Sequence, residues 1–203
     1  MERDGIIRVA TRLFAELGYD ETELSLIAGA AGIPSSEIVA MFGGKQELYR
    51  AVMQQADDTE RTALRAALAD FASTPEAVKR LADAYLDFFA DNPQILRLWM
   101  HRWIGDASDT PELEEGYTRP LVQDVVDAVS PLLPRGVDAR FFIWTIVWCV
   151  YGFLTSGVLD RPRSERHIRP ADIQQFRAHL HWMLDRQLEQ PGTDSPATKE
   201  HGA

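Results

Sequence analysis

The chain has 203 residues, which is enough for one large or two small domains with a substantial hydrophobic core. Its 31 acidic and 21 basic residues give a formal net charge of −10, so the chain as a whole lacks the basic character of a general nucleic-acid binder. A single cysteine excludes an internal disulfide framework and favours a reducing, cytoplasmic compartment. The first residues include acids and no long apolar run, so we expect no secretory signal peptide.

Apolar residues recur at intervals of three and four along the chain, and no alternating strand pattern persists, which predicts an all-α fold. A first helix is expected at 4–17. Thr22 is expected to cap a second helix, Gly32 to supply a tight turn, and Pro34 to open a third helix that ends near Phe42. Two short helices joined by a tight turn form the pattern of a helix-turn-helix.

Six longer helices are expected after this head, which brings the predicted total to about nine. They are predicted at 45–72, 76–90, 94–104, 117–133 with an interruption near Pro120, 141–159 and 171–188. An acidic loop is expected at 105–116 and an arginine-rich connection at 160–170. The predicted domains are therefore a head at 1–45, a helical body at 46–190 and a disordered tail at 191–203.

The segment 141–159 is 19 residues long and carries no charged side chain, so its length alone would allow it to cross a membrane. The alternative is a helix that is buried on all sides inside a dimer. Because the segment contains glycine, threonine and serine and the rest of the chain is amphipathic, we favour the buried helix and expect no membrane partner.

The head has a specific order of residues. An apolar stripe ends in LFAELGYDET, IAGAAGI follows, a short helix closes at Phe42, and Lys45 begins a K-x-x-L-Y sequence. This order resembles the DNA-binding head of TetR-family transcriptional regulators over residues 5–53. The resemblance implies a bacterial homodimer that presents two heads to successive major grooves of an operator and binds a small molecule in its body. Expected DNA contacts are Thr22, Ser35, Ser36, Glu37, Ala40, Met41 and Lys45.

The outer residues of the third helix depart from the family pattern. Val39 stands where the family usually has a tyrosine that touches phosphate, and Ala40 and Met41 stand where polar residues are usual. Residues 1–50 contain five basic and eight acidic side chains, a net charge of −3, although phosphate neutralisation supplies most non-specific affinity for DNA. One hypothesis is a regulator, expected to be a repressor, with few phosphate contacts. The alternative is a dimer that has weak or no DNA binding, senses its ligand and acts through protein contacts.

Aromatic residues are concentrated in the body and have two interpretations, ordinary core packing or an apolar small-molecule pocket with a few polar anchors. An apolar or aromatic ligand would suit such walls, whereas an anionic ligand would need Arg97 or Arg102 to turn inward. The candidate pocket residues are Tyr85, Phe89, Trp99, His101, Trp103, Trp144, Trp148 and Tyr151. The dimer is expected to use the last two helices, through Gly152, Ser156, Ile173, Phe176, Leu180 and Leu184.

The residues give little support to catalysis. Cys149 falls in the apolar helix and is interpreted as an inert core thiol. His179 and His181 are two residues apart and point to different sides of a helix, so we expect no shared metal. We therefore predict no catalytic residue, metal or cofactor, and keep an all-α lipophile-binding protein or enzyme as the third alternative.

Overall fold

The structure is a computed structural model that describes residues 2–69, 71–107, 113–158 and 168–189. Within these residues the fold is all-α, as the apolar periodicity predicts. The helices are α1 (Arg3–Leu17), α2 (Leu24–Ala31), α3 (Ser35–Phe42), α4 (Lys45–Ala69), α5 (Pro75–Asp91), α6 (Pro93–Trp103), α7 (Arg119–Val129), α8 (Ala139–Ser156) and α9 (Pro170–Leu188). The predicted tail at 191–203 and most of the predicted connection at 160–170 lie outside the described residues.

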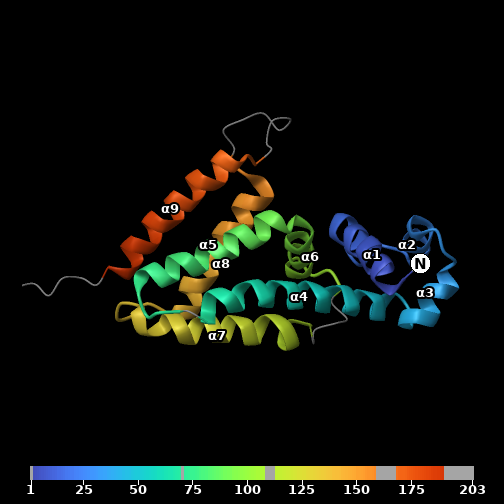
Figure 1. The fold of residues 1–203 in the computed structure, drawn as a ribbon, viewed down its shortest axis with the longest axis horizontal. Helices are drawn as coiled ribbons and strands as arrows, with labels where there is room; N and C mark the ends of the chain where they lie inside the picture. The colour runs from blue at the N-terminus through green and yellow to red at the C-terminus, as the bar shows by residue number, and fades with distance from the viewer. Residues whose placement is uncertain (1, 70, 108–112, 159–167, 190–203) are drawn as a thin grey trace, which may run out of the picture.

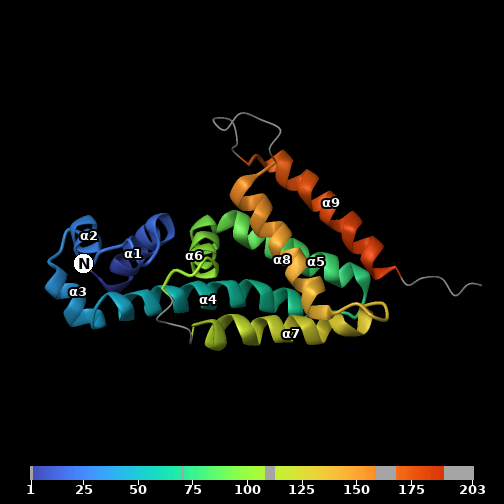
Figure 2. The ribbon, with the colours of Figure 1, turned by 180° about the vertical axis from the view of Figure 1, so that it is seen from behind.

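Helices α1 to α3 form a small head at one end of an elongated molecule (Figure 1). Helix α4 runs from this head into the body, where α5 lies along one side of it and α7 along the other. Helix α8 crosses the body behind α5 in Figure 1 and in front of it in Figure 2, and α9 packs on α5. The long α4 is therefore the element that joins the head to the body.

The head has its own buried centre, which explains why three short helices are stable there. Residues at three- and four-residue spacing on α1, among them Ile6 and Phe14, are fully buried against Ile27 of α2 and Ile38 of α3. The ring of Phe14 meets the ring of Tyr49 edge-on at 5.1 Å, which ties the head to the start of α4. Helices α2 and α3 differ in direction by 106°, within the range of a helix-turn-helix.

Two predicted details of the head are corrected. Gly32 ends α2 in the left-handed conformation as expected, with φ +68°, but Thr22 does not cap that helix. The residue before α2 is Glu23, and the fully buried Thr22 hydroxyl instead donates to the backbone carbonyl of Gly18 at 2.5 Å. Pro34 lies immediately before α3 in an extended conformation rather than inside its first turn.

The predicted loop at 105–116 is shorter than expected. Leu113 is buried, and a π-helical turn, η1 (Glu114–Thr118), leads directly into α7. Pro120 therefore falls in the first turn of α7, next to the point where the π-helical turn changes to an α-helix, so the irregularity predicted near Pro120 is a change of helix type rather than a break. Helix α7 ends at Val129 and a short 3-10 turn, η2 (Ser130–Leu132), follows.

Among the described residues, α8 is the one single helix that is long and apolar enough to cross a membrane by length and composition. One third of its residues are buried inside the chain. Several large apolar side chains of α8 remain exposed, including Phe141 at 65% and Trp148 at 53%. The helix thus packs on the body along one face and leaves an apolar stripe uncovered on another.

The buried Thr22 hydroxyl gives a test of how the head is held together. Thr22→Val keeps the size and β-branching of the side chain but leaves the Gly18 carbonyl without this donor, and we expect a loss of about 1–2 kcal/mol of unfolding free energy. Thr62→Val is the matched control, because the exposed Thr62 hydroxyl donates to the Asp58 carbonyl within α4 and should cost less than about 0.5 kcal/mol. Equal urea midpoints for the two variants would contradict this role of Thr22.

Candidate functional site

The outer face of the head is built by α3. Ser36, Val39 and Ala40 are exposed on it, and Met41 is 37% exposed. Ser35 and Glu37 are half-buried. The face is therefore small and mostly apolar, with hydroxyl groups and backbone N–H groups at its N-terminal end, where the helix dipole favours a phosphate.

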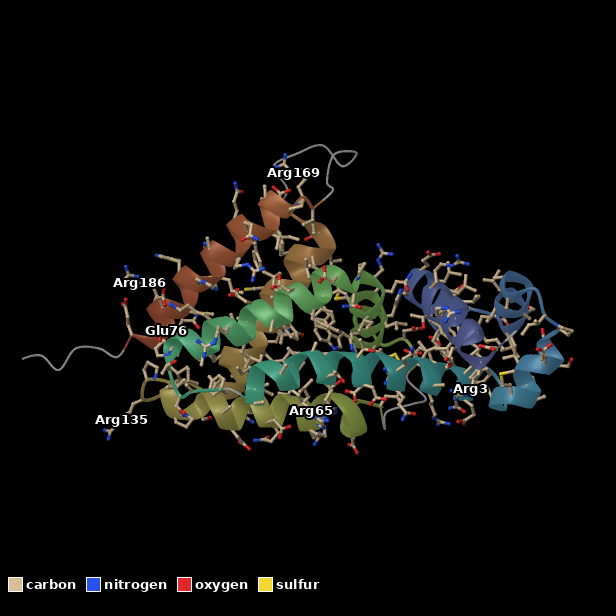
Figure 3. The ribbon with its side chains drawn as sticks, in the orientation of Figure 1. Arg3, Arg65, Glu76, Arg135, Arg169 and Arg186 are labelled. Carbon is tan, nitrogen blue, oxygen red and sulfur yellow. The ribbon has the colours of Figure 1, made fainter. Side chains whose placement is uncertain are left out.

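Two cations flank this face, and each lies over an aromatic ring. The Lys45 ammonium lies 4.4 Å from the ring centre of Tyr19, and its Nζ donates to the Asp20 carbonyl at 3.4 Å. The Arg3 guanidinium lies 4.8 Å from the ring centre of Phe42. Lys45 is the first residue of α4, and Arg3 lies over Phe42, the last residue of α3 (Arg3 is labelled in Figure 3). Thr22, by contrast, is fully buried, so its side chain cannot reach a DNA backbone. Thr22 is therefore not part of the outer face of the head.

The body contains a cavity of about 80 Å³ between α4, α5, α6, α7 and α8. Five of the eight predicted pocket residues line it, namely Tyr85, Trp99, Trp103, Trp144 and Tyr151. Aliphatic side chains of α7, including Leu121 and Val125, form the opposite wall. A cavity of this size holds several waters or a compact chemical group, since one water needs about 10–15 Å³.

The other three predicted pocket residues lie elsewhere. Phe89 is fully buried behind the wall, where its ring packs edge-on against Tyr85 at 4.8 Å. His101 lies on the far side of α6, near Gly18 of the head. Trp148 faces outward and lines a separate surface hollow with Phe141 and Arg140. A sequence pattern gives the face of a helix only approximately, and here it assigned these three residues to the wrong environment.

A continuous series of rings joins that surface hollow to the cavity. Trp148 packs on Trp144 at 6.0 Å between ring centres, Trp144 on Trp103 at 5.6 Å, and Trp103 stacks on Tyr151 at 4.3 Å. Trp103 and Trp144 line both the hollow and the cavity. Rotation of these two side chains would therefore open a path from the surface to the cavity.

Two acidic residues in the cavity wall, Asp57 and Glu60 of α4, were missed by the sequence analysis. Both are buried. The sequence does contain a signal, because Met53, Asp57, Glu60 and Leu64 recur at three- and four-residue spacing and so share the inward face of α4. This spacing places both acids against the core.

The two carboxyl groups have different partners. Arg61 donates to both oxygens of Asp57, at 3.2 and 3.3 Å. Burial raises the pKa of Asp57, and Arg61 opposes this rise. Glu60 accepts a hydrogen bond from the Trp99 indole N–H at 3.1 Å, while burial and the nearby Asp57 raise its pKa to about 8. Glu60 is therefore mostly protonated at neutral pH when the cavity holds no charged group.

Neither arginine that an anionic ligand would need is turned into the cavity. Arg97 is exposed on α6. Arg102 is buried, but its guanidinium donates to the carbonyls of Asp106 and Ala107 rather than into the cavity. None of the described residues that line the cavity is basic.

The turn after α6 fastens the body to the head. The Asp106 carboxylate accepts from the backbone N–H of Tyr19 at 2.6 Å and from that of Asp20 at 2.9 Å. Gly18 allows this approach, since a Cβ there would lie 3.1 Å from His101 Nδ1 and 3.2 Å from Asp106 Oδ2. Ala107, with φ +52°, adopts a left-handed conformation that is unfavourable for alanine, and the Arg102 hydrogen bonds hold its carbonyl.

Of the six residues suggested for a dimer, the two on α8 are exposed and the four on α9 are buried or half-buried. Gly152 and Ser156 are exposed, in line with Phe141 and Trp148. Leu180 and Leu184, however, are buried within the chain, because the apolar stripe of α9 packs on α5. In the same way Phe176 stacks on Phe153 of α8 at 4.1 Å, and Ile173 is half-buried. The exposed aromatic residue of α9 is Trp182, at 57%.

No group of three or more histidine, cysteine, aspartate or glutamate side chains suited to a metal ion occurs among the residues that the structure describes. His179 stacks on Trp182 at 5.7 Å, whereas His181 Nε2 lies 2.9 Å from Asp83 Oδ1. The two rings thus contact different side chains. Burial raises the pKa of the Cys149 thiol, which keeps it in its less reactive form.

Comparison with known proteins adds to this geometry. Residues 6–52 match the model of a family described as bacterial regulatory proteins, tetR family. The transcriptional regulator RutR of Escherichia coli (strain K12) is 30% identical over 138 residues, which cover 68% of this chain and 63% of that protein. The transcriptional activator FasR of Mycolicibacterium smegmatis is 30% identical over 142 residues, with the same coverages. The chain thus matches less than two thirds of the length of these relatives.

The fold is shared with solved structures. AibR in complex with isovaleryl coenzyme A and operator DNA superposes with a TM-score of 0.72 at 16% identity, over 89% of this chain and 96% of that one. At this identity the likeness concerns the fold. The shared fold includes both the head and the body, whereas the match to the family model covers residues 6–52 in and next to the head.

The raised pKa of Glu60 predicts how stability depends on pH. Because the folded protein binds this proton more tightly than the unfolded chain, the stability from protonated Glu60 is present at low pH and is lost as pH rises towards 8. Glu60→Gln keeps an acceptor for Trp99 but cannot ionise. Between pH 5.5 and 8.5 we expect the variant to gain on the order of 3 kcal/mol relative to the wild type, measured by urea unfolding. A constant difference over this range would contradict the burial of a titrating Glu60.

Proposed function

Because this chain belongs to the TetR family of transcriptional regulators, we propose that it is a ligand-responsive regulator that binds a near-palindromic operator as a homodimer. The proposed action is repression, relieved when a small molecule enters the body. The family is one of regulators rather than enzymes, so we set aside the enzyme alternative. A DNA-binding regulator of this kind acts in the bacterial cytoplasm.

The observation that carries this proposal is the double role of α6. Trp99 and Trp103 of this helix line the cavity, and α1 of the head packs on the same helix. Asp106, just after its end, accepts the two amides of the head. A molecule that displaces Trp99 or Trp103 therefore moves the support on which the head rests.

Two heads read two half-sites when their recognition helices lie about 34–36 Å apart, one turn of DNA. A shift of α6 in each subunit changes this separation and so weakens binding to the operator. The signal needs no change inside the head itself. Its packed core of α1, α2 and α3 would move as one unit.

In the proposed complex, α3 enters the major groove. Ser35, Ser36 and the N–H groups at the start of α3 contact phosphate, and Lys45 leaves the Tyr19 ring to reach the backbone. Ala40 and Met41 contact a thymine methyl group, and Glu37 accepts from a cytosine N4 amino group. Direct phosphate contacts from basic side chains are few, so affinity should depend weakly on salt.

A second candidate function is favoured by the charge of the head. Its net charge of −3 over residues 1–50 and the exposed Val39, Ala40 and Met41 also suit a surface that contacts another protein. In that case the chain is a ligand sensor that has lost most of its affinity for DNA. Selection of binding sites from random and genomic DNA distinguishes a DNA-binding regulator from such a sensor.

We propose that the dimer forms through the exposed faces of α8 and α9. Phe141, Trp148, Gly152 and Ser156 make one stripe of α8, and Gly152 allows close approach of a partner helix. Trp182 of α9, which is 57% exposed, would supply a second apolar anchor. Aromatic anchors surrounded by small residues are typical of such interfaces.

Selection from random and genomic DNA at low ionic strength tests the regulator directly. With the folded dimeric protein we expect enrichment of a near-palindromic sequence. Lys45→Ala should then weaken binding to every sequence and lower the salt slope by about one. Arg186→Ala is the control, since Arg186 lies at the end of the body furthest from the head (Figure 3) and should leave both quantities unchanged. If no sequence is enriched, the sensor without DNA binding becomes the better account.

Light scattering at micromolar concentration tests the dimer surface. Trp182→Glu places a charge in the proposed interface and should convert the dimer to a monomer, while the protomer keeps its helical content because Trp182 is 57% exposed. Val137→Glu is the control, an exposed apolar residue at the turn between α7 and α8. A wild-type protein that is monomeric, or a Trp182→Glu variant that stays dimeric, would refute this surface.

A further inference from the structure

The cavity has an uneven composition. Its side chains include two carboxyl groups, from Asp57 and Glu60, and the rings of five aromatic residues, while none of its described lining residues is basic. Arg61 engages the Asp57 carboxylate from the same helix. Glu60 has the neutral indole of Trp99 as its hydrogen-bond partner. Of the two acids, Glu60 is therefore the one without a basic hydrogen-bonding partner, and it lies among the aromatic rings.

From this arrangement we propose that the effector of the regulator is an organic cation, a lipophilic amine or quaternary ammonium compound whose charged head lies between Glu60 and the faces of Trp99, Trp103 and Tyr85. The inference rests on the proposed function, because it names the class of molecule that this cavity takes. Aromatic faces attract cations through the negative potential above the ring, and a carboxylate supplies the full opposite charge.

The groups around Glu60 favour a cation over the other ligand classes. From α4, Asp57 repels its negative charge and Arg61 attracts it; from α5 and α8, Tyr85 and Tyr151 face it. Burial raises the pKa of both tyrosines well above the usual value, so both remain neutral. An anion would meet two acids, and an uncharged molecule would leave Glu60 protonated, with no gain from its charge.

The shape of the cavity sets the form of the ligand. About 80 Å³ accommodates a compact head group, and the aliphatic wall of α7, with Leu121, Val122 and Val125, suits an apolar body. Trp103 and Trp144 separate this space from the surface hollow beside Trp148. A ligand with a longer apolar part would extend between these two rings.

The experiment compares two probes that differ in charge and hardly in shape. Benzyltrimethylammonium and its carbon isostere neopentylbenzene are titrated into the full-length protein, and binding is followed by tryptophan fluorescence and calorimetry. We expect the cation to bind at least tenfold more tightly. Its affinity should rise about tenfold between pH 7 and pH 9, because Glu60 must lose its proton when the cation binds. The affinity of the isostere should stay level or fall over the same range.

Glu60→Gln identifies the responsible side chain. This substitution should lower the affinity for the cation at least tenfold and remove the pH dependence of that affinity. It should change the affinity for the isostere less than about twofold. Glu76→Gln, an exposed substitution on α5, is the matched control and should change neither. If Glu60→Gln does not fold, the comparison of the two probes and the pH series on the wild type still decide the proposal.

The proposal is overturned if the isostere binds as tightly as the cation, if the affinity of the cation does not rise with pH, or if folded Glu60→Gln binds the cation as the wild type does. It is also overturned if neither probe binds. None of these outcomes decides whether the protein is a DNA-binding regulator. That proposal is tested separately, by whether the DNA selection yields an operator. Release of that operator by the cation and not by the isostere would support both proposals together.

Discussion

The Asp106 carboxylate holds the head of this protein in place by accepting the backbone N–H groups of Tyr19 and Asp20. Two amides that follow α1 would otherwise face the body without a carboxylate partner, and the close contact requires glycine at position 18. The orientation of α3 at the end of the molecule thus depends on where α6 ends. Through this contact, the same helix that forms part of the cavity wall sets the position of the head.

Much of this architecture can be predicted from the sequence because its helices are marked by local signals. Apolar spacing defines their inner faces, and residues such as Gly32 and Pro93 define where they end and begin. The boundaries at η1 were missed, because a π-helical turn has no recognisable sequence signal and Pro120 suggested an interruption. The family resemblance of the head agrees with the match over residues 6–52.

The site was harder to predict than the fold, for a physical reason. Which aromatic residues line a cavity depends on small rotations of helices in three dimensions, so Trp148 and Phe89 were assigned to the cavity although one faces outward and the other lies behind its wall. Contacts between distant segments, such as that of Asp106 with Tyr19, leave no periodic pattern at all. The burial of Glu60 is predictable from the sequence, because its spacing from Met53 and Leu64 places it on the buried face of α4.

The left-handed backbone of Ala107 has a consequence for how the molecule changes shape. An alanine in this conformation is higher in energy by roughly 1–2 kcal/mol, and its return to a right-handed conformation requires a jump between separate regions of φ and ψ. A glycine would pass through intermediate geometries at little cost. A junction built on alanine therefore favours an abrupt change between two backbone conformations over a gradual drift.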